Sequence, residues 1–235
     1  MQYKNHLFFG IVLTVILIMS SFAFLNKSSR LIKKVTVSFE SQGARFLSDS
    51  VVNKLLIQKK GELPWKAKDS LVLSMLESLL EDNPYIDNAE VFHFYQGVLG
   101  VNIIEKIAVL RVLGQDQFYL DRLGNQFPLS NNHTPKVPLY HGKFNEKQKK
   151  DLLSLINLID KDPFLRNELA SIDYRSNSYF IGLRSYGFEV EIGQMRRIGE
   201  KLSKLKVFCA YHDNNLLNRN YSLINLKFKN QVVGS

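Results

Sequence analysis

The sequence predicts an α+β protein that follows a single N-terminal transmembrane helix. Three observations predict it: an uncharged apolar stretch near the start, a β-α-α-β-β order of hydrophobic periodicities up to residue 105, and a strand-rich pattern after it. We expect a mixed α/β second domain dominated by an antiparallel sheet. The predicted parts are a tail at 1–6, a membrane helix at 7–25, a first domain at 33–105 and a β-domain at 106–233.

Composition favours a folded protein over a disordered one, because 45% of residues are hydrophobic and 23% are charged. The net charge of +9 is spread along the chain, and its densest basic stretch, Lys143–Lys150, is interrupted by Glu146. A solvated basic surface is therefore favoured over nucleic-acid binding. Cys209 is the single cysteine, so no intramolecular disulfide can form and cysteine usage does not identify the compartment.

The apolar stretch at residues 7–25 contains no charged side chain and as a helix spans roughly 28 Å, close to the hydrocarbon thickness of a bilayer. A retained anchor and a cleaved signal peptide are the two interpretations, the second with Ser21-Phe22-Ala23 as a weak cleavage site. The stretch exceeds the usual apolar region of a signal peptide, roughly 7–15 residues, and bulky Phe22, Phe24 and Leu25 crowd its end. These features favour the anchor.

The charges that flank the apolar stretch bear on which side of the membrane the C-terminal part lies. Only Lys4 and the α-amino group precede the stretch, whereas Lys27, Arg30, Lys33 and Lys34 follow it. The positive-inside rule alone would place the large C-terminal part in the cytoplasm, although long domains can translocate regardless of flanking charge.

The first domain is predicted from local signals. Ser48 is a suitable N-cap, the second helix carries an apolar stripe that faces a core, and Gln96-Gly97 is a two-residue hairpin signal. The predicted elements are a strand at Lys34–Phe39, helices at Ser48–Ile57 and Lys68–Glu81, and strands at Ile86–Tyr95 and Val98–Ile104.

The second domain is predicted in the same way. Gly124 is expected to adopt a positive φ in a hairpin, and Pro163 is expected to follow the end of a helix. The predicted elements are a strand-turn-strand at Phe118–Phe127, a strand at Lys136–Tyr140, a helix at Glu146–Ile159, strands at Ser171–Arg175, Ser178–Arg184 and Phe188–Ile192, a helix at Met195–Phe208 and a last strand at Tyr221–Lys229.

No catalytic, cofactor or metal site is predicted. The five histidines form neither an H-E-x-x-H motif nor an i, i+4 pair, and the chain has no Walker A or G-x-G-x-x-G sequence. Cys209 and His212 could form a nucleophile and its base, but a buried cysteine is the favoured interpretation. Asp121 could act as an acid or base, but we expect its carboxylate to bond the amides of a hairpin turn.

Four stretches together carry a resemblance to a known family. They are Asp69-Ser70-Leu71 with Leu73 and Leu76-Glu77, then Asn83–Val91, Phe118–Leu129 and Tyr221–Val233. In this order, behind an N-terminal anchor, they resemble the FtsQ/DivIB family of bacterial cell-division proteins over nearly the whole chain. The sequence departs from the family pattern at Ile107 and Ala108, where a proline is frequent, and at Asn225 and Lys227, where aspartate and arginine are usual.

The resemblance implies a POTRA domain at 33–105 and a non-catalytic divisome scaffold that links early and late division proteins. It implies a single-pass type II protein of the inner membrane, with a cytoplasmic N-terminus and periplasmic C-terminal domains, enriched at the division septum. The implied partners are FtsB and FtsL, with FtsK-like and septal wall-synthesis proteins as further ones. No nucleic acid and no small-molecule substrate are expected.

The last predicted strand is the expected partner-binding element. If this strand lies at a sheet edge, its free N–H and C=O groups can pair with an extended segment of FtsB. Tyr221, Leu223, Asn225 and Lys227 are the expected contacts, and an ordinary buried or solvent-facing strand is the alternative.

Two other functions remain open. A POTRA-containing protein-transport or outer-membrane assembly factor would also use strand addition, but the chain shows neither repeated units nor a series of amphipathic membrane strands. A membrane-anchored wall hydrolase is the other. Three outcomes would distinguish the functions. Filaments without septa after depletion would support the division scaffold, and defective outer-membrane protein insertion would support the transport factor. Muropeptides altered by the purified protein would support the hydrolase.

Overall fold

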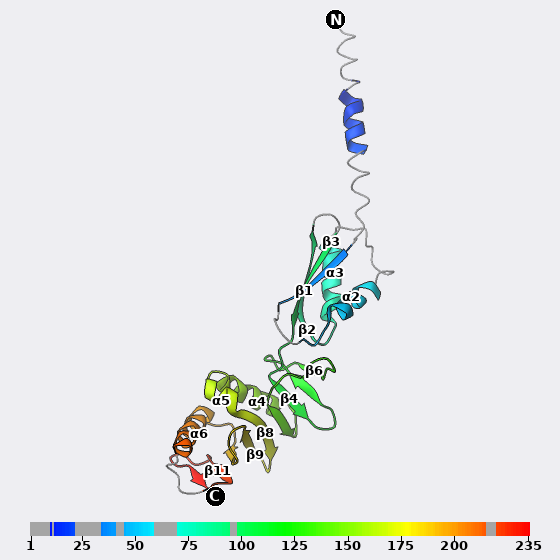
Figure 1. Cartoon of the computed structure of the whole chain (residues 1–235). Coiled ribbons are helices and arrows are strands. Elements are labelled where there is room, and N and C mark those ends of the chain that lie inside the picture. Colours follow the sequence, from blue (N-terminus) through cyan, green and yellow to red (C-terminus); the bar gives the residue numbers. More distant parts are fainter. Residues whose placement is uncertain are drawn as a thin grey trace. The chain divides into compact units, whose positions relative to one another are not determined.

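The computed structural model describes residues 10, 12–21, 34–40, 45–58, 70–94, 98–214 and 220–235. It divides the chain into two compact units, Met1–Glu105 and Lys106–Ser235 (Figure 1), and each is considered by itself. Gly10 and residues 12–21 are helical, whereas the rest of the predicted membrane helix and the tail at 1–6 lie outside the described residues. Within the described ranges, we find no helix both long enough and apolar enough to cross a membrane.

The first unit contains one sheet and two helices in the predicted order. β3 is the central strand, parallel to β1 and antiparallel to β2. The elements are β1 (Lys34–Phe39), α2 (Asp49–Gln58), α3 (Ser70–Glu81), β2 (Ile86–Phe94) and β3 (Val98–Glu105). Ser48 directly precedes α2, as predicted, and its carbonyl accepts from Val51 and Val52. The predicted hairpin turn at Gln96-Gly97 lies outside the described residues.

The helices of this unit pack on one face of the sheet. Their apolar stripes bury Val52 and Leu56 from α2 and Leu76 and Leu80 from α3 against Val101 and its neighbours on the strands. The outer edge of β2 is also occupied, because Val91 N–H donates to Glu77 (2.9 Å) and Ala89 N–H to Glu81 (3.3 Å). These carboxylates of α3 cap amides that an added strand would need.

The second unit is built on a nine-stranded sheet, ordered β12-β11-β10-β9-β8-β7-β4-β5-β6. Its strands are β4 (Leu110–Leu113), β5 (Phe118–Leu120), β6 (Gln126–Pro128), β7 (Leu139–Gly142), β8 (Leu169–Arg175), β9 (Ser178–Leu183), β10 (Glu189–Gly193), β11 (Leu223–Asn225) and β12 (Val233–Gly234). Its helices are α4 (Glu146–Ile159), α5 (Pro163–Glu168) and α6 (Ile198–Asp213).

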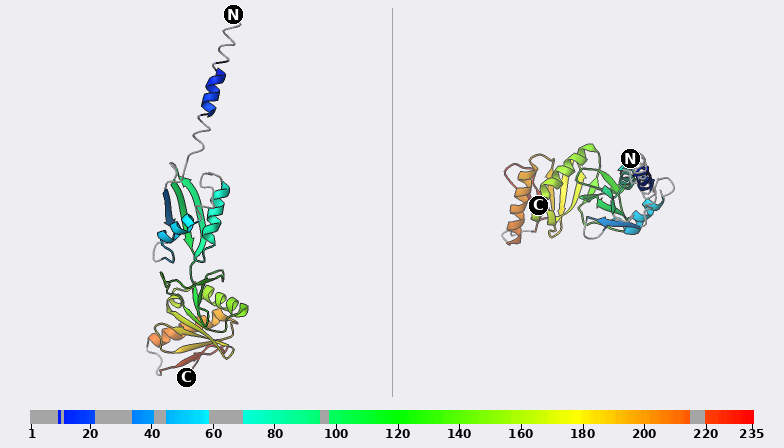
Figure 2. Two further views of the ribbon diagram at one scale, coloured as in Figure 1. Left: turned by 90° about the vertical axis from the view of Figure 1, so that its right-hand side faces the viewer. Right: turned by 90° about the horizontal axis from the view of Figure 1, so that it is seen from above.

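A lateral row of buried side chains defines the core of this unit. Tyr140, Ile172, Ile181, Val190 and Ile224 are successive cross-strand neighbours from β7 to β11, so they point to one face. Helices α4 and α6 cover that face (Figure 2) and bury their apolar stripes there. Asn145 caps α4 by accepting from Lys147 and Gln148 N–H.

Mixed α+β architecture with a large mixed sheet is confirmed, but the sheet is less antiparallel than expected. Three of the eight strand pairings in the described sheet are parallel: β4 with β7, β7 with β8, and β10 with β11. Two of these place a helix between the paired strands, because a parallel connection must cross the sheet.

Several boundaries also differ from the predictions. β7 begins at Leu139, because Pro138 has no N–H to donate and supplies only a carbonyl, which accepts from Arg111. α5 was not predicted. Pro163 begins this helix, and the Asp162 carboxylate caps it by accepting from Phe164 and Leu165 N–H. β4 was not assigned from the sequence either.

The predicted Asp121 turn is confirmed. Asp121 Oδ1 accepts from the N–H groups of Leu123 (2.9 Å) and Asn125 (2.8 Å), and Gly124 has a φ of 82°. The buried carboxylate is therefore a turn-forming group.

Candidate partner-binding edge of the second unit

The final segment does not form the single long strand that we expected at Tyr221–Lys229. The strand β11 contains only Leu223–Asn225, the chain then bends, and it returns antiparallel as β12. As a result, β11 lies between β10 and β12, and the free edge belongs to β12. The strand β12 was not predicted because its pairing with β11 is short. Only Ile224↔Gly234 and Asn225↔Val233 pair, and two residues are too few to give a periodicity in the sequence.

The hydrogen bonds fix which groups of β12 remain free. Leu223 and Ser235 exchange both backbone bonds, at 3.1 and 3.0 Å, so they form a hydrogen-bonded pair. In an antiparallel ladder such pairs alternate with non-bonded ones, so the N–H and C=O groups of Gly234 point away from β11. Val232 directly precedes β12, and the same alternation, continued by one residue, would direct its backbone groups outward as well. The β12 side of the sheet therefore presents Gly234 as an outward position, and Val232 is the expected next one.

Tyr221 holds this edge in place. Its ring packs against Phe208 of α6, with centroids 5.6 Å apart, and lies directly over Gly234. A Cβ at Gly234 would come within 2.3 Å of Tyr221 Cδ1, so only glycine allows this close approach.

An apolar groove runs beside the same edge. It has a volume of about 390 Å³ and lies between the outer side of α6 and Val232. Val207 and Tyr211 of α6 contribute to it and are 57% and 51% exposed. Lys204 Nζ donates to the carbonyl oxygens of Phe228 (2.8 Å) and Lys229, which fastens the bend before β12 to the helix.

Asn225 and Lys227 meet at one buried carboxylate. Glu191, 8% exposed, accepts from Asn225 Nδ2 (2.9 Å), from Lys227 Nζ (2.7 Å) and from Ser178 Oγ (2.8 Å). Burial opposes ionisation of Glu191, but the hydrogen bonds from Lys227 and Ser178 outweigh it and lower its pKa. Both residues thus have structural partners at the end of β10.

A basic pocket of about 410 Å³ opens at this end of the strands. Arg196, Arg197, Lys201 and Lys227 line it together with Glu191. Lys201 is 6% exposed and donates to the Ile192 and Gln194 carbonyls, and its pKa is lowered by burial and by the charges of Arg197 and Lys204. Since Glu191 is the pocket's acidic residue, the lining has an excess of positive charge that favours an acidic ligand.

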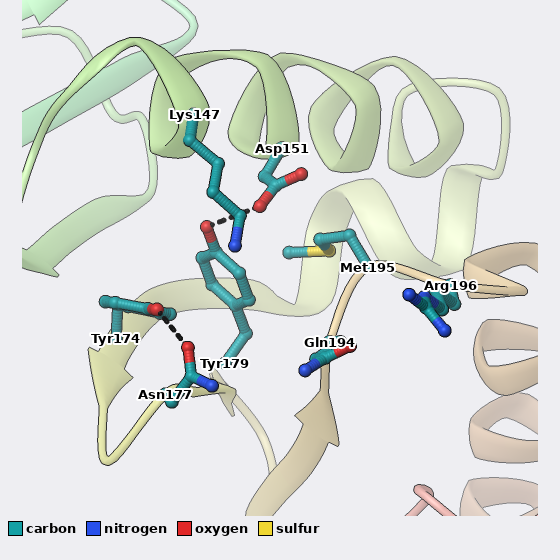
Figure 3. A pocket seen from close by; sticks show the side chains of 8 residues that line it. All are labelled: Lys147, Asp151, Tyr174, Asn177, Tyr179, Gln194, Met195 and Arg196. Carbon is teal, nitrogen blue, oxygen red and sulfur yellow. Dashed lines mark hydrogen bonds between the residues drawn. The ribbon is translucent and has the colours of Figure 1, made fainter.

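A smaller cavity of about 200 Å³ adjoins the basic pocket (Figure 3). Tyr179 donates to Asp151 (2.9 Å) from β9 to α4, and Tyr174 donates to Asn177 (2.7 Å). Burial, followed by the Asp151 hydrogen bond, raises the pKa of Tyr179 above its ordinary value, so its phenol stays protonated. The Tyr179 phenol therefore joins the sheet to α4, whereas the Tyr174 phenol fastens the turn between β8 and β9.

Cys209 lies in a setting that disfavours a nucleophile. It is fully buried, and burial raises the pKa of its thiol to about 11, so the reactive thiolate is scarce at neutral pH. In the parts of the chain that the structure covers, no group of three His, Cys, Asp or Glu side chains is arranged to hold a metal ion.

The four predicted contacts thus occupy different settings. Tyr221 supports β12 from the α6 side, Leu223 gives both backbone groups to Ser235, Asn225 bonds Glu191, and Lys227 remains exposed at the basic pocket. The sequence did not identify β12, the groove or the basic pocket. The adjacent Val232 and Val233 before Gly234 are the signal that could have indicated a further strand.

Comparisons with known proteins indicate the family of this chain. The family model described as "FtsQ/DivIB, C-terminal related" matches residues 108–235, more than half of the chain. A solved structure, the major extracytoplasmic domain of the trans isomer of the cell-division protein DivIB from Geobacillus stearothermophilus, is 18% identical, with a TM-score of 0.34. The match covers 47% of this chain and 97% of that one, and at this similarity we draw nothing from it. The curated proteins gave no match.

The family model includes two of the four stretches that carry the resemblance, Phe118–Leu129 and Tyr221–Val233, and it spans the unit that carries the β12 edge. Members of this family are non-catalytic scaffolds with a role in cell division. The chain belongs to the FtsQ/DivIB family.

Proposed function

We propose that this chain is a divisome scaffold that binds FtsB, of the FtsB–FtsL pair, by strand addition at β12. The observation that carries the proposal is the free β12 edge, where the backbone groups of Gly234 point outward and Val232 directly precedes the strand. An extended FtsB segment would continue the sheet there and gain main-chain hydrogen bonds.

Two neighbouring features supply specificity for the same docking mode. The apolar groove beside Val232 can receive alternate apolar side chains of an added strand. The basic pocket at Lys227 lies at the end of β10 and β11 and favours an acidic residue of the partner. Within this proposal Leu223 and Lys227 present side chains near the docked strand, while Tyr221 and Asn225 support the edge from within.

The cellular setting is part of the proposal. Residues 7–25 would anchor the protein in the inner membrane with its N-terminus cytoplasmic, and residues 33–105 would act as a POTRA domain that helps to localise it at the septum. FtsK-like and septal wall-synthesis proteins would be further partners. Confinement to the membrane raises the effective concentration of single-pass partners, so modest affinity suffices for assembly.

Site-specific photocrosslinking tests the docking mode. A photoreactive residue at Val233, on the β12 edge, is expected to crosslink the full chain to FtsB in membranes. The same residue at Gln126, on the opposite β6 edge, is the matched control and is expected to give no FtsB adduct. Equal adducts at both positions, or none at Val233 in a folded protein, would contradict strand addition at β12.

Depletion in cells tests the function independently of the docking mode. We expect filaments that lack septa, because the scaffold links early and late division proteins. Normal division with defective outer-membrane protein insertion would instead support the transport alternative.

A further inference from the structure

A third cavity lies at the other end of strands β8 and β9 from the basic pocket. β8 begins beside this cavity at Leu169 and ends at Arg175, next to the turn that lines the basic pocket. The cavity has a volume of about 160 Å³. It is lined by the ends of α4 and β9, by α5, and by the segments that lead into β4, β7 and β8. It is therefore separate from the proposed FtsB site.

The floor of this cavity is apolar. Val109, Ile156, Ile159 and Leu169 line it and are buried in the core of the second unit. Ile107, which also lines the cavity, is 69% exposed. An exposed isoleucine beside an apolar floor leaves continuous apolar surface open to solvent.

The rim of the cavity carries uncompensated positive charge. Lys136, Arg166 and Arg184 line it, and in the described part of the chain their side chains have neither a hydrogen-bond nor an ion-pair partner. The fourth rim cation, Arg122, pairs with Asp160 at 2.7 Å.

The nearby carboxylates are committed elsewhere. Glu168 accepts from Ser185 N–H (3.0 Å) and Oγ (2.9 Å), and Asp162 pairs with Lys206. Neither carboxylate forms an ion pair with Arg166 or Arg184.

We infer that this cavity binds an acidic peptide segment of a partner protein, which inserts one aliphatic side chain and places carboxylates on the rim. Charge complementarity selects the acidic residues, since three rim cations form no ion pair with any residue that the structure describes. The apolar floor selects the aliphatic anchor, because a charged group placed there would lose its hydration without a partner. The cavity is smaller than the roughly 300–1,000 Å³ of small-molecule sites, which suits a single side chain.

Fluorescence anisotropy of the purified full chain in neutral detergent tests the inference. The probe is a labelled peptide in which aspartates and glutamates flank one leucine. We expect it to bind, and we expect about tenfold weaker binding when the acids become asparagine and glutamine or when the leucine becomes serine. Equal binding of the neutral peptide would overturn the inference.

Variants locate the binding site. Arg166→Ala and Arg184→Ala should each weaken binding up to about fivefold, the usual limit for one exposed ion pair. Val137→Trp should weaken it without any change of charge, because the indole would fill the cavity that Val137 lines. Circular dichroism and thermal melting confirm that each variant folds.

Lys150→Ala is the matched control, since Lys150 is an exposed cation outside the cavity lining, and it should not alter peptide affinity. Lys227→Ala removes a cation of the basic pocket, and weaker peptide binding in this variant alone would place the peptide at that pocket and overturn the inference. Unchanged affinity in the Arg166 and Arg184 variants would overturn the inference. Charge-dependent binding to phosphatidylglycerol vesicles in place of the peptide would also overturn it, in favour of a lipid headgroup.

Discussion

The two edges of the nine-stranded sheet differ in what they offer to a partner. At the β12 edge the outward position is Gly234, and the next one expected is Val232, directly before the strand; both residues have an N–H to donate. At β6, Asp121 N–H donates to Asn125 O, so the alternation directs Gln126 and Pro128 outward. Pro128 has no N–H, so this edge lacks one of its two donors.

The difference indicates that one edge is blunted and the other is left open. Proline on an edge strand prevents pairing with further chains, a common protection against aggregation. The first unit protects an edge by another route, because Glu77 and Glu81 accept from the outer amides of β2. β12 has neither device and adjoins an apolar groove, so it is the edge most suited to a partner strand.

The largest expected effect is at Gly234. Gly234→Ala places a Cβ 2.3 Å from Tyr221 Cδ1, so the edge must shift, at a cost of roughly 1–3 kcal/mol. If β12 is the docking strand, FtsB should bind roughly tenfold to hundredfold more weakly in a titration with the full chain.

Gly199→Ala provides the control for this change. Gly199 lies in α6, and a Cβ there meets nothing within 4 Å. The variant should keep its FtsB affinity and gain up to about 1 kcal/mol of helix stability. Equal FtsB affinity in the Gly234 and Gly199 variants would contradict docking at β12.

Removal of one outward donor should have a smaller effect. Val232→Pro deletes an N–H that is expected to point away from β11, so it should cost one intermolecular hydrogen bond, about 0.5–1.5 kcal/mol. FtsB should then bind roughly threefold to tenfold more weakly by calorimetry. Val233→Thr, which keeps the backbone donors, should bind normally, and a loss in that variant alone would indicate side-chain recognition instead.

The reverse change at β6 sharpens the comparison. Pro128→Val restores an outward N–H and should open that edge to pairing. We expect concentration-dependent self-association, measured by sedimentation velocity. The restored hydrogen bond should contribute about 0.5–1.5 kcal/mol to it, and FtsB affinity should be unchanged. A strictly monomeric variant would indicate that the proline does not protect this edge.

The smallest expected effect concerns Glu191 and pH. Its pKa is lowered in the folded protein, so the stability that it contributes is present above its ordinary pKa of 4.5 and is lost as pH falls through the lowered value. Glu191→Gln should lower the melting temperature of the second unit by a few degrees at pH 7 and by less at pH 3. An equal difference at both pH values would exclude this charge network as the cause.

The sequence predicted elements with strong local signals. The apolar stripe of α4, the Asp121 turn and the positive φ of Gly124 were predicted correctly, because each depends on neighbouring residues alone. α5 was missed because Pro163 was interpreted only as a helix stop, although Asp162 and Pro163 together form an N-terminal capping signal.

The candidate site was less predictable, because it depends on pairing between distant segments. Tyr221, Leu223, Asn225 and Lys227 do lie at the β12 side of the sheet, but which strand is the edge follows from contacts of two or three residues. The basic pocket gathers Arg196, Lys201 and Lys227 from a loop, a helix and the segment after a strand. No periodicity in the sequence brings such residues together.

Hydrogen exchange of individual amides tests the central claim most directly. In the free full chain, the N–H groups of Val232 and Gly234 should exchange quickly, whereas those of Leu223 and Ser235, which bond each other's carbonyls, should exchange slowly. Addition of FtsB should protect Val232 and Gly234 and leave Gln126 on β6 unchanged. Fast exchange at Val232 and Gly234 in the saturated complex would contradict strand addition at β12.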